Sequence, residues 1–154
     1  MQIKKVLNSK EIKKIEEILT RNYSCDFKLR EYFVFINSDD KLWIVSKDIV
    51  KFETENLRRI NSMGLYFGRL KKNNKISLSI EGCQLIGKTA KKNIVIVNEE
   101  NMKKFFNGND IVGEQINCEV NNFVLVKFKD DFIGMGILRD GKIENLLPKS
   151  RRLI

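Results

Sequence analysis

Residues 105–116 read FFNGNDIVGEQI and mark the point where a helical pattern gives way to strands. Upstream, residues 98–106 place their apolar side chains on one helical face and two glutamates in the first turn, where negative charge is favoured. Residues 107–110, Asn-Gly-Asn-Asp, end this helix because these residue types prefer turns. Residues 111–116 then lead into strands. The stretch therefore predicts a helix, a glycine-containing loop and a strand in direct succession.

Short strands lie on both sides of this stretch. Residues 94–97 (IVIV) are a short apolar run, and residues 123–128 (FVLVKF) and 132–138 (FIGMGIL) follow as two longer strands. An Asp-Gly turn precedes a last strand over residues 143–147, which Pro148 ends because proline has no N–H donor. Several short strands with closely spaced turns predict a small, mostly-β barrel.

Glycines and a basic C-terminus give this barrel three features that suit either binding or structure. The glycine in the loop at 107–110 allows positive φ, so the loop can present N–H groups to a phosphate or a base edge, or simply cap the helix. Gly134 and Gly136 indicate a close neighbour or a curved strand. The final NLLPKSRR segment places three cations beside the last strand, or forms a solvated tail.

The first half alternates helical and strand patterns. Residues 8–20 carry an apolar stripe at helical spacing, and residues 32–36 and 42–45 are runs of aromatic and β-branched residues typical of strands. Residues 46–52 predict a short helix. Residues 64–70 and 75–80 predict a hairpin around an Asn-Asn turn, which tolerates positive φ.

A short basic segment follows this hairpin. Residues 84–88 predict another short helix, and residues 87–92 (GKTAKK) are polar and basic. We place the domain boundary in this segment. Because it is too short for a flexible tether, we expect the two halves to pack against each other.

The order of the segments in the second half resembles the PUA domain, a small RNA-binding barrel. The resemblance begins at about Lys92 and rests on IVIV, FFNGNDIVGEQI, FVLVKF, FIGMGIL and NLLPKSRR. The last two segments also resemble the C-terminal RNA-binding region of the NOL/NOP/Sun rRNA methyltransferases. In the first half, LWIVSKDIVKF and MGLYFGRLKKNNKISLSI resemble the pre-PUA domain of the Nip-seven ribosome-biogenesis family. The resemblance implies an α+β protein, with a pre-PUA domain of helices and a small antiparallel sheet over residues 1–90 and a PUA domain over residues 91–154.

The positive charge is concentrated in two segments. The formal net charge is +9, and residues 56–92 hold nine Lys/Arg against one acid. The chain after Glu144 adds three cations and no acid. This asymmetry favours a polyanion as partner. An anionic membrane is the rival partner, but the lysines lack a basic amphipathic helix with a bulky apolar face.

The residue types present argue against an enzyme. The chain has no histidine, which removes the commonest general base and nearly every catalytic zinc site. Its three cysteines are far apart, and neither a metal-binding spacing nor a nucleotide-binding motif occurs, so we expect no metal and no cofactor. We also expect no transmembrane helix, because no apolar run approaches 18 residues, and no signal peptide, because the N-terminus is polar. A soluble, intracellular protein is the expectation, and the resemblance implies an archaeal-type factor in the cytoplasm.

The resemblance implies a non-catalytic protein that contacts ribosomal or pre-ribosomal RNA in large-subunit assembly. Assembly-factor proteins are further expected partners, and neither a membrane nor a preference for DNA is expected. RNA contacts are expected at the loop after the helix, at the basic C-terminus and, as an extension onto the first domain, at the basic hairpin. The residues are Asn107, Gly108, Asn109, Lys149, Arg151, Arg152, Arg69, Lys71 and Lys72.

Two alternatives to this function remain open. In the first, the protein is an adaptor whose pre-PUA domain docks an assembly or RNA-modification factor, and RNA contact is incidental. In the second, it is an accessory subunit of an RNA-modifying enzyme, since the sequence shows no methyl-donor or nucleotide site of its own.

Overall fold

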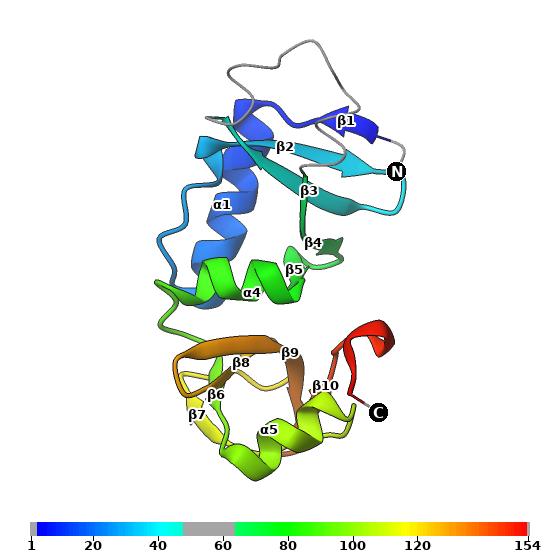
Figure 1. Ribbon diagram of the computed structural model, residues 1–154. Helices are drawn as coiled ribbons and strands as arrows, with labels where there is room; N and C mark the ends of the chain where they lie inside the picture. Colours follow the sequence, from blue (N-terminus) through cyan, green and yellow to red (C-terminus); the bar gives the residue numbers. More distant parts are fainter. Residues whose placement is uncertain (1–2, 48–63, 154) are drawn as a thin grey trace.

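Two five-stranded sheets make up the computed structural model, which describes residues 3–47 and 64–153 (Figure 1). Each half of the chain contributes one sheet, and helices lie against both. The fold is α+β, as the sequence predicts. The first sheet is antiparallel and consists, in spatial order, of β1 (Ile3–Val6), β2 (Tyr32–Asn37), β3 (Lys41–Ser46), β4 (Leu65–Lys71) and β5 (Lys75–Leu78).

Helix α1 (Ser9–Tyr23) covers one face of this sheet. It begins with a capping box, in which the Asn8 side chain accepts from the Glu11 N–H at 2.9 Å and the Glu11 carboxylate accepts from the Asn8 N–H at 3.1 Å. Its apolar stripe is buried, which confirms the helix predicted from residue 8 onward. The helix runs to Tyr23, three residues past the predicted end. The short 3-10 turn η1 (Leu29–Glu31) then leads into β2.

Strand β1 was not predicted from the sequence. It contains only four residues, three of them exposed, and it is held at the edge of the sheet by pairing with the distant β2. The hairpin of β4 and β5 was predicted, and its turn residues Asn73 and Asn74 both have positive φ (67° and 55°). The helix predicted over residues 46–52 lies almost entirely outside the described residues, and Ser46 is the last residue of β3.

Helix α4 (Ile80–Gly87) begins earlier than predicted. The alternation of isoleucine and leucine with Ser77 and Ser79 favours a strand through residue 80, but β5 ends at Leu78. Ser79 instead caps the helix, because its hydroxyl accepts from the Gly82 N–H at 2.9 Å. The predicted short helix over residues 84–88 is therefore the second half of a longer one.

The second sheet curls into the small barrel that the sequence predicts. Its strands, in spatial order, are β10 (Lys142–Asn145), β9 (Asp131–Arg139), β8 (Phe123–Phe128), β6 (Ile94–Ile96) and β7 (Glu114–Ile116). An isolated bridge closes the curl, because Ile111, ahead of β7, exchanges backbone hydrogen bonds with Ile143 of β10 (2.8 and 3.1 Å). Helix α5 (Glu99–Phe106) lies across one end of the barrel (Figure 1).

Both glycines of the FIGMGIL strand are structural. Gly134, with φ +153°, lies at a bulge in β9, where an added Cβ would meet the Phe105 ring of α5 at 2.8 Å. An added Cβ at Gly136 would meet Ile143 of β10 at 2.3 Å. The missing side chains therefore let α5 and β10 approach β9 closely, which is the close-neighbour interpretation rather than a binding site.

The largest apolar cluster spans both halves, and the barrel interior holds a second cluster of its own. Helix α4 lies between the two sheets (Figure 1), and its buried Cys83 and Ile86 belong to the same apolar cluster as Met135 of the barrel. Gly87 ends α4 so closely against β9 that an added Cβ would lie 2.3 Å from the Phe132 ring. The Leu78 N–H also points at the Met135 sulfur at 3.3 Å. These contacts confirm that the halves pack together, and they fix an orientation that the sequence left open.

Candidate nucleic-acid interface

The loop after α5 is a helix cap whose backbone donors are already used. The Gly108 N–H donates to the Phe105 carbonyl and the Asn109 N–H to the Lys104 carbonyl, both at 2.9 Å, while Gly108 has φ +85°. This pair of bonds is a Schellman motif, the ending that glycine gives to many helices. The Asn107 N–H donates to the Lys103 carbonyl at 3.1 Å. The interpretation that these amides are presented to RNA is therefore wrong, because the α5 carbonyls occupy them.

The side chains of the loop remain exposed. Asn107 and Asn109 are both on the surface, and among the described residues neither side chain makes a hydrogen bond. Each carboxamide offers a donor and an acceptor, the combination that suits the edge of a base or a sugar hydroxyl.

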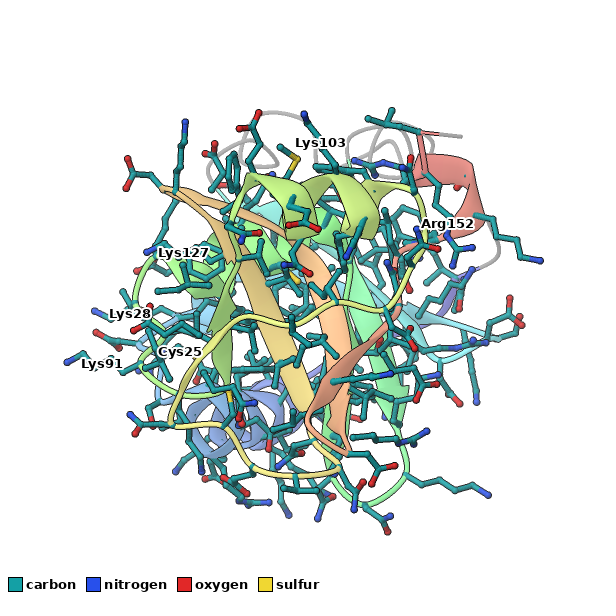
Figure 2. The ribbon with its side chains drawn as sticks, turned by 90° about the horizontal axis from the view of Figure 1, so that it is seen from below. Cys25, Lys28, Lys91, Lys103, Lys127 and Arg152 are labelled. Atoms are coloured by element: carbon teal, nitrogen blue, oxygen red, sulfur yellow. The ribbon has the colours of Figure 1, made fainter. Side chains whose placement is uncertain are left out.

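The basic C-terminal segment folds back over this loop. After Pro148 the chain makes the 3-10 turn η2 (Lys149–Arg151), and the Leu153 N–H then donates to the Phe106 carbonyl at 2.7 Å. The Arg152 side chain lies across Gly108, since an added Cβ there would meet it at 2.8 Å, and its Nε donates to the Leu147 carbonyl at 3.1 Å. Figure 2 shows Arg152 on the opposite side of the barrel from Lys127. The tail thus packs against the loop through Arg152 and Leu153. The predicted residues of the loop and the tail are together called the tail surface here: Asn107, Gly108, Asn109, Lys149, Arg151 and Arg152.

Asn145, which the sequence did not single out, joins the loop to the tail. Its Nδ2 donates to the Phe105 and Asn109 carbonyls, both at 2.8 Å. Its Oδ1 accepts from the Leu147 N–H at 2.7 Å, which turns the chain two residues after β10 ends. This turn explains why the last strand stops at Asn145 rather than at the predicted residue 147. An asparagine directly after a strand and before Pro148 is a turn signal that could have indicated this role.

The three cations of the tail surface differ in their surroundings. Lys149 is exposed and forms no ion pair within the described part of the chain. Arg151 pairs with Glu81 of α4 at 3.1 Å, and the two side chains are 48% and 35% exposed. An exposed pair of this kind contributes about 0–1 kcal/mol, so a phosphate can displace it. Arg152 is half-buried at the C-terminal end of α5, where positive charge also balances the helix dipole.

The predicted hairpin residues lie in two places. Lys71 and Lys72 line a groove between the two sheets, whereas Arg69 is not part of the groove lining and its Nε donates to the Asp39 carbonyl at 2.9 Å. The structure therefore brings Lys71 and Lys72 towards the barrel and does not bring Arg69 there. Sequence reasoning missed Lys75 and Arg139, which line the same groove.

The cysteines are poorly placed for nucleophilic chemistry. All three are free thiols, and burial is the main cause that raises the pKa of Cys25, Cys83 and Cys118 above the usual range. Because the thiolate is the reactive form, each is a weak nucleophile near neutral pH. Within residues 3–47 and 64–153 there is no group of three or more Asp, Glu or Cys side chains arranged to hold a metal, and no helix there is long and apolar enough to cross a membrane.

Comparison with known families assigns both halves. The family model described as the NIP7/UPF0113 pre-PUA domain matches residues 4–80, and the model of the methyltransferase RsmF PUA domain matches residues 92–153. The chain thus shares only the PUA part with the methyltransferase family. No curated protein matches the chain. The pre-PUA match covers half of the sequence, and its order before a PUA domain agrees with the two sheets described above. The chain therefore belongs to the NIP7/UPF0113 family, whose pre-PUA and PUA domains are the architecture of RNA-binding ribosome-biogenesis proteins.

Proposed function

We propose that this protein binds ribosomal or pre-ribosomal RNA through the tail surface and assists assembly of the large ribosomal subunit without catalysis. One observation carries the proposal. The Arg152 side chain lies across Gly108, so the basic tail packs directly against the loop that carries the exposed asparagines. Family membership supports the choice of RNA as that ligand.

Each residue of the tail surface has a distinct role in this proposal. Lys149 and Arg151 contact phosphates, which supplies affinity through release of counterions but little sequence preference. The Asn107 and Asn109 carboxamides contact base or sugar edges and supply the selectivity. Arg152 positions the loop, since its guanidinium is already engaged by the Leu147 carbonyl at 3.1 Å. Asn145 is a second positioning residue.

The chemistry of the side chains supports a role without catalysis. The chain lacks histidine, and burial keeps its thiols protonated at neutral pH. Of the RsmF methyltransferase family it shares the PUA part alone. We place the protein in the cytoplasm, where ribosomal RNA and assembly factors are both present as partners.

The test is RNA binding across a salt series. Lys149→Ala/Arg151→Ala removes both proposed phosphate contacts and leaves Arg152 in place, so the loop keeps its support. For a single-stranded RNA, we expect the slope of log K against log salt to become shallower by about 1.4, or about 0.7 per lost contact. Fluorescence anisotropy at salt concentrations from about 50 to 300 mM measures this slope, because counterion release is resolved over roughly that range.

The matched control is Lys10→Ala/Lys13→Ala, which removes two exposed lysines from the outer face of α1, where alanine favours the helix. Its slope should equal that of the wild type. Equal slopes for the control and the tail variant would mean that the tail surface makes no phosphate contacts. Absence of binding by the wild type at low salt would overturn RNA binding altogether and favour an adaptor that docks assembly factors.

A further inference from the structure

A groove of about 620 Å³ runs between the β4–β5 hairpin and the barrel, and the proposed function does not use it. It is called the inter-sheet groove here. Its rim is formed by Lys71, Lys72 and Lys75 from the hairpin and by Arg139 from the end of β9. Its floor is formed by Phe123 and Leu146, together with Ile137 and Ser77. Because both halves contribute, the groove exists only in the packed arrangement of the two sheets.

The rim carries four positive charges, and no acidic side chain lines the groove. Lys71 and Lys72 are exposed and form no ion pair within the described residues. Arg139 pairs with Glu144 at 2.9 Å, but the two side chains are 53% and 45% exposed, so water screens this attraction. The Lys75 Nζ donates to the Asn121 carbonyl at 3.2 Å, which ties the hairpin to the barrel, and Glu119 lies near enough to offset part of the Lys75 charge. The groove is therefore strongly electropositive.

The register of the hairpin adds an independent indication. Lys71 and Lys75 are direct partners across the β4–β5 ladder. Like charges in this position repel and destabilise a hairpin, and Lys72 in the adjoining turn adds a third. An anion bound between them removes this repulsion. The hairpin thus gains stability when a phosphate lies at the groove.

The floor indicates more than a bare phosphate. Phe123, Ile137 and Leu146 are apolar and only partly buried, so they offer a surface on which a planar base can pack. Stacking on an aromatic ring contributes about 1–3 kcal/mol per base and is tolerant of sequence. A base must leave its duplex to reach such a floor, whereas a duplex presents only phosphates to the rim. The chemistry of rim and floor together suits a single strand.

The groove continues towards the tail surface. A smaller hollow, also lined by Ser77 and Leu146, extends along the chain to Pro148, the residue before Lys149. Arg151 is tied to Glu81 of α4 at 3.1 Å, which keeps the tail beside the junction of the two halves. One strand can therefore run from the groove to the tail surface along this hollow, whose lining is uncharged.

We propose that the inter-sheet groove is a second RNA site that holds a single-stranded segment, with phosphates on Lys71, Lys72 and Arg139 and a base against Phe123 and Leu146. The site rests on the proposed function, because it extends the same strand from the tail surface onto the first half. It goes beyond that function in two ways. The groove selects single-stranded RNA, and it depends on residues of the pre-PUA domain.

The experiment compares the full-length wild type with three double variants on a 15-nucleotide RNA that cannot pair with itself, a length on the order of what one single-strand-binding fold accommodates. Lys71→Ala/Lys72→Ala tests the rim, Lys149→Ala/Arg151→Ala tests the tail, and Lys10→Ala/Lys13→Ala is the charge-matched control. We expect the rim variant to lose about tenfold in affinity at low salt and to have a slope shallower by about 1.4. The control should lose neither.

A second arm tests the floor. The RNA carries a single photoreactive 4-thiouridine, and mass spectrometry identifies the peptide to which it is crosslinked. We expect crosslinks to the peptide containing Phe123, and their loss in Ser77→Glu, which places a carboxylate on the floor without removing an apolar side chain. We also expect the rim variant to lose less affinity for an RNA duplex of the same length than for the single strand, because the duplex presents only its phosphates.

The outcomes separate this site from the proposed function. If the tail variant loses affinity while the rim variant behaves like the control, the groove is not an RNA site, although the protein still binds RNA. If the rim variant loses as much on the duplex as on the single strand, and Phe123 is not crosslinked, selection of single strands is wrong. If the wild type binds neither RNA, both proposals fail together.

Discussion

The tail surface and the inter-sheet groove are both basic, but the protein holds their cations differently. In the tail surface, the Arg152 side chain is anchored on Leu147 and Gly108, and Asn145 ties the loop to the same segment. In the groove, Lys71 and Lys72 extend into solvent from a hairpin turn. The anchored loop loses less freedom when a ligand binds, so its asparagines suit recognition of a defined shape, whereas Lys149 of the tail is as exposed as the groove lysines. Long, free lysines supply charge at many geometries and suit a mobile strand.

The two surfaces also depend on different parts of the fold. The tail surface is built on α5, β10 and the C-terminal segment, with Glu81 as a contact from the first half. The groove needs both sheets in register. A substitution at the junction of the halves should therefore weaken RNA binding by the groove more than RNA binding by the tail surface. The largest predicted effect follows from this difference.

Gly87→Val should have the largest effect. An added Cβ at this position lies 2.3 Å from the Phe132 ring, so α4 and β9 have to move apart. We expect the overpacked side chain to lower the free energy of unfolding by up to about 3 kcal/mol. Unfolding in urea measures this loss. We expect RNA binding by the groove to fall more than binding by the tail surface. Equal loss at both surfaces would show that the tail also depends on the junction.

Asn145→Asp should destabilise the tail surface by about 2 kcal/mol, because the Phe105 and Asn109 carbonyls lose their donor and face a carboxylate instead. Urea unfolding measures the cost, and the salt slope measures the effect on RNA. The slope should become shallower as the tail loses its fixed position, while crosslinking to Phe123 in the groove persists. An unchanged slope would mean that the tail cations do not need the loop.

Gly108→Ala should cost about 1.5 kcal/mol, because φ +85° is unfavourable for alanine and the new Cβ meets Arg152 at 2.8 Å. Gly141→Ala is the matched control, since Gly141 has φ +75° with nothing within 4 Å of an added Cβ. The difference between their free energies of unfolding isolates the Arg152 contact. If the two variants are equally destabilised, Arg152 does not hold the loop.

Glu81→Gln should have the smallest effect, below about 1 kcal/mol in the free energy of unfolding, because the pair with Arg151 is exposed. Releasing Arg151 should raise the affinity for RNA slightly, because the arginine no longer has to leave the Glu81 carboxylate before it binds a phosphate. Weaker RNA binding would instead show that Glu81 orients Arg151 for its phosphate. Anisotropy at low salt distinguishes these results.

Local chemistry allowed much of the fold to be predicted. The Asn73–Asn74 turn, the apolar stripe of α1 and the break at Gly108 all depend on neighbours within a few residues. Strand β1 escaped prediction because its pairing with β2 is long-range and its own four residues are mostly exposed. Ser79 was misassigned to a strand because the same alternation fits a strand end and a helix cap.

The candidate site divides in the same way. The residues of the tail surface were predicted from the sequence as RNA contacts. The sequence could not show that the loop amides cap α5 or that Arg152 lies on Gly108, because both depend on how the chain folds back. The inter-sheet groove was beyond prediction, since its lining comes from both halves and depends on how they pack against each other. Its one local signal is the Lys71–Lys75 pair across the turn.

The shared core has a consequence for how this family's two domains are combined. As a sequence, a pre-PUA and a PUA domain look like exchangeable modules, but here the buried ring of Phe132 is matched to the absence of a side chain at Gly87. A PUA domain taken from another protein would need a complementary face at this spot. Cut apart, each half would expose part of one continuous apolar cluster, so we expect the chain to melt as a single cooperative unit rather than as two. The junction is thus where the two modules have to evolve together.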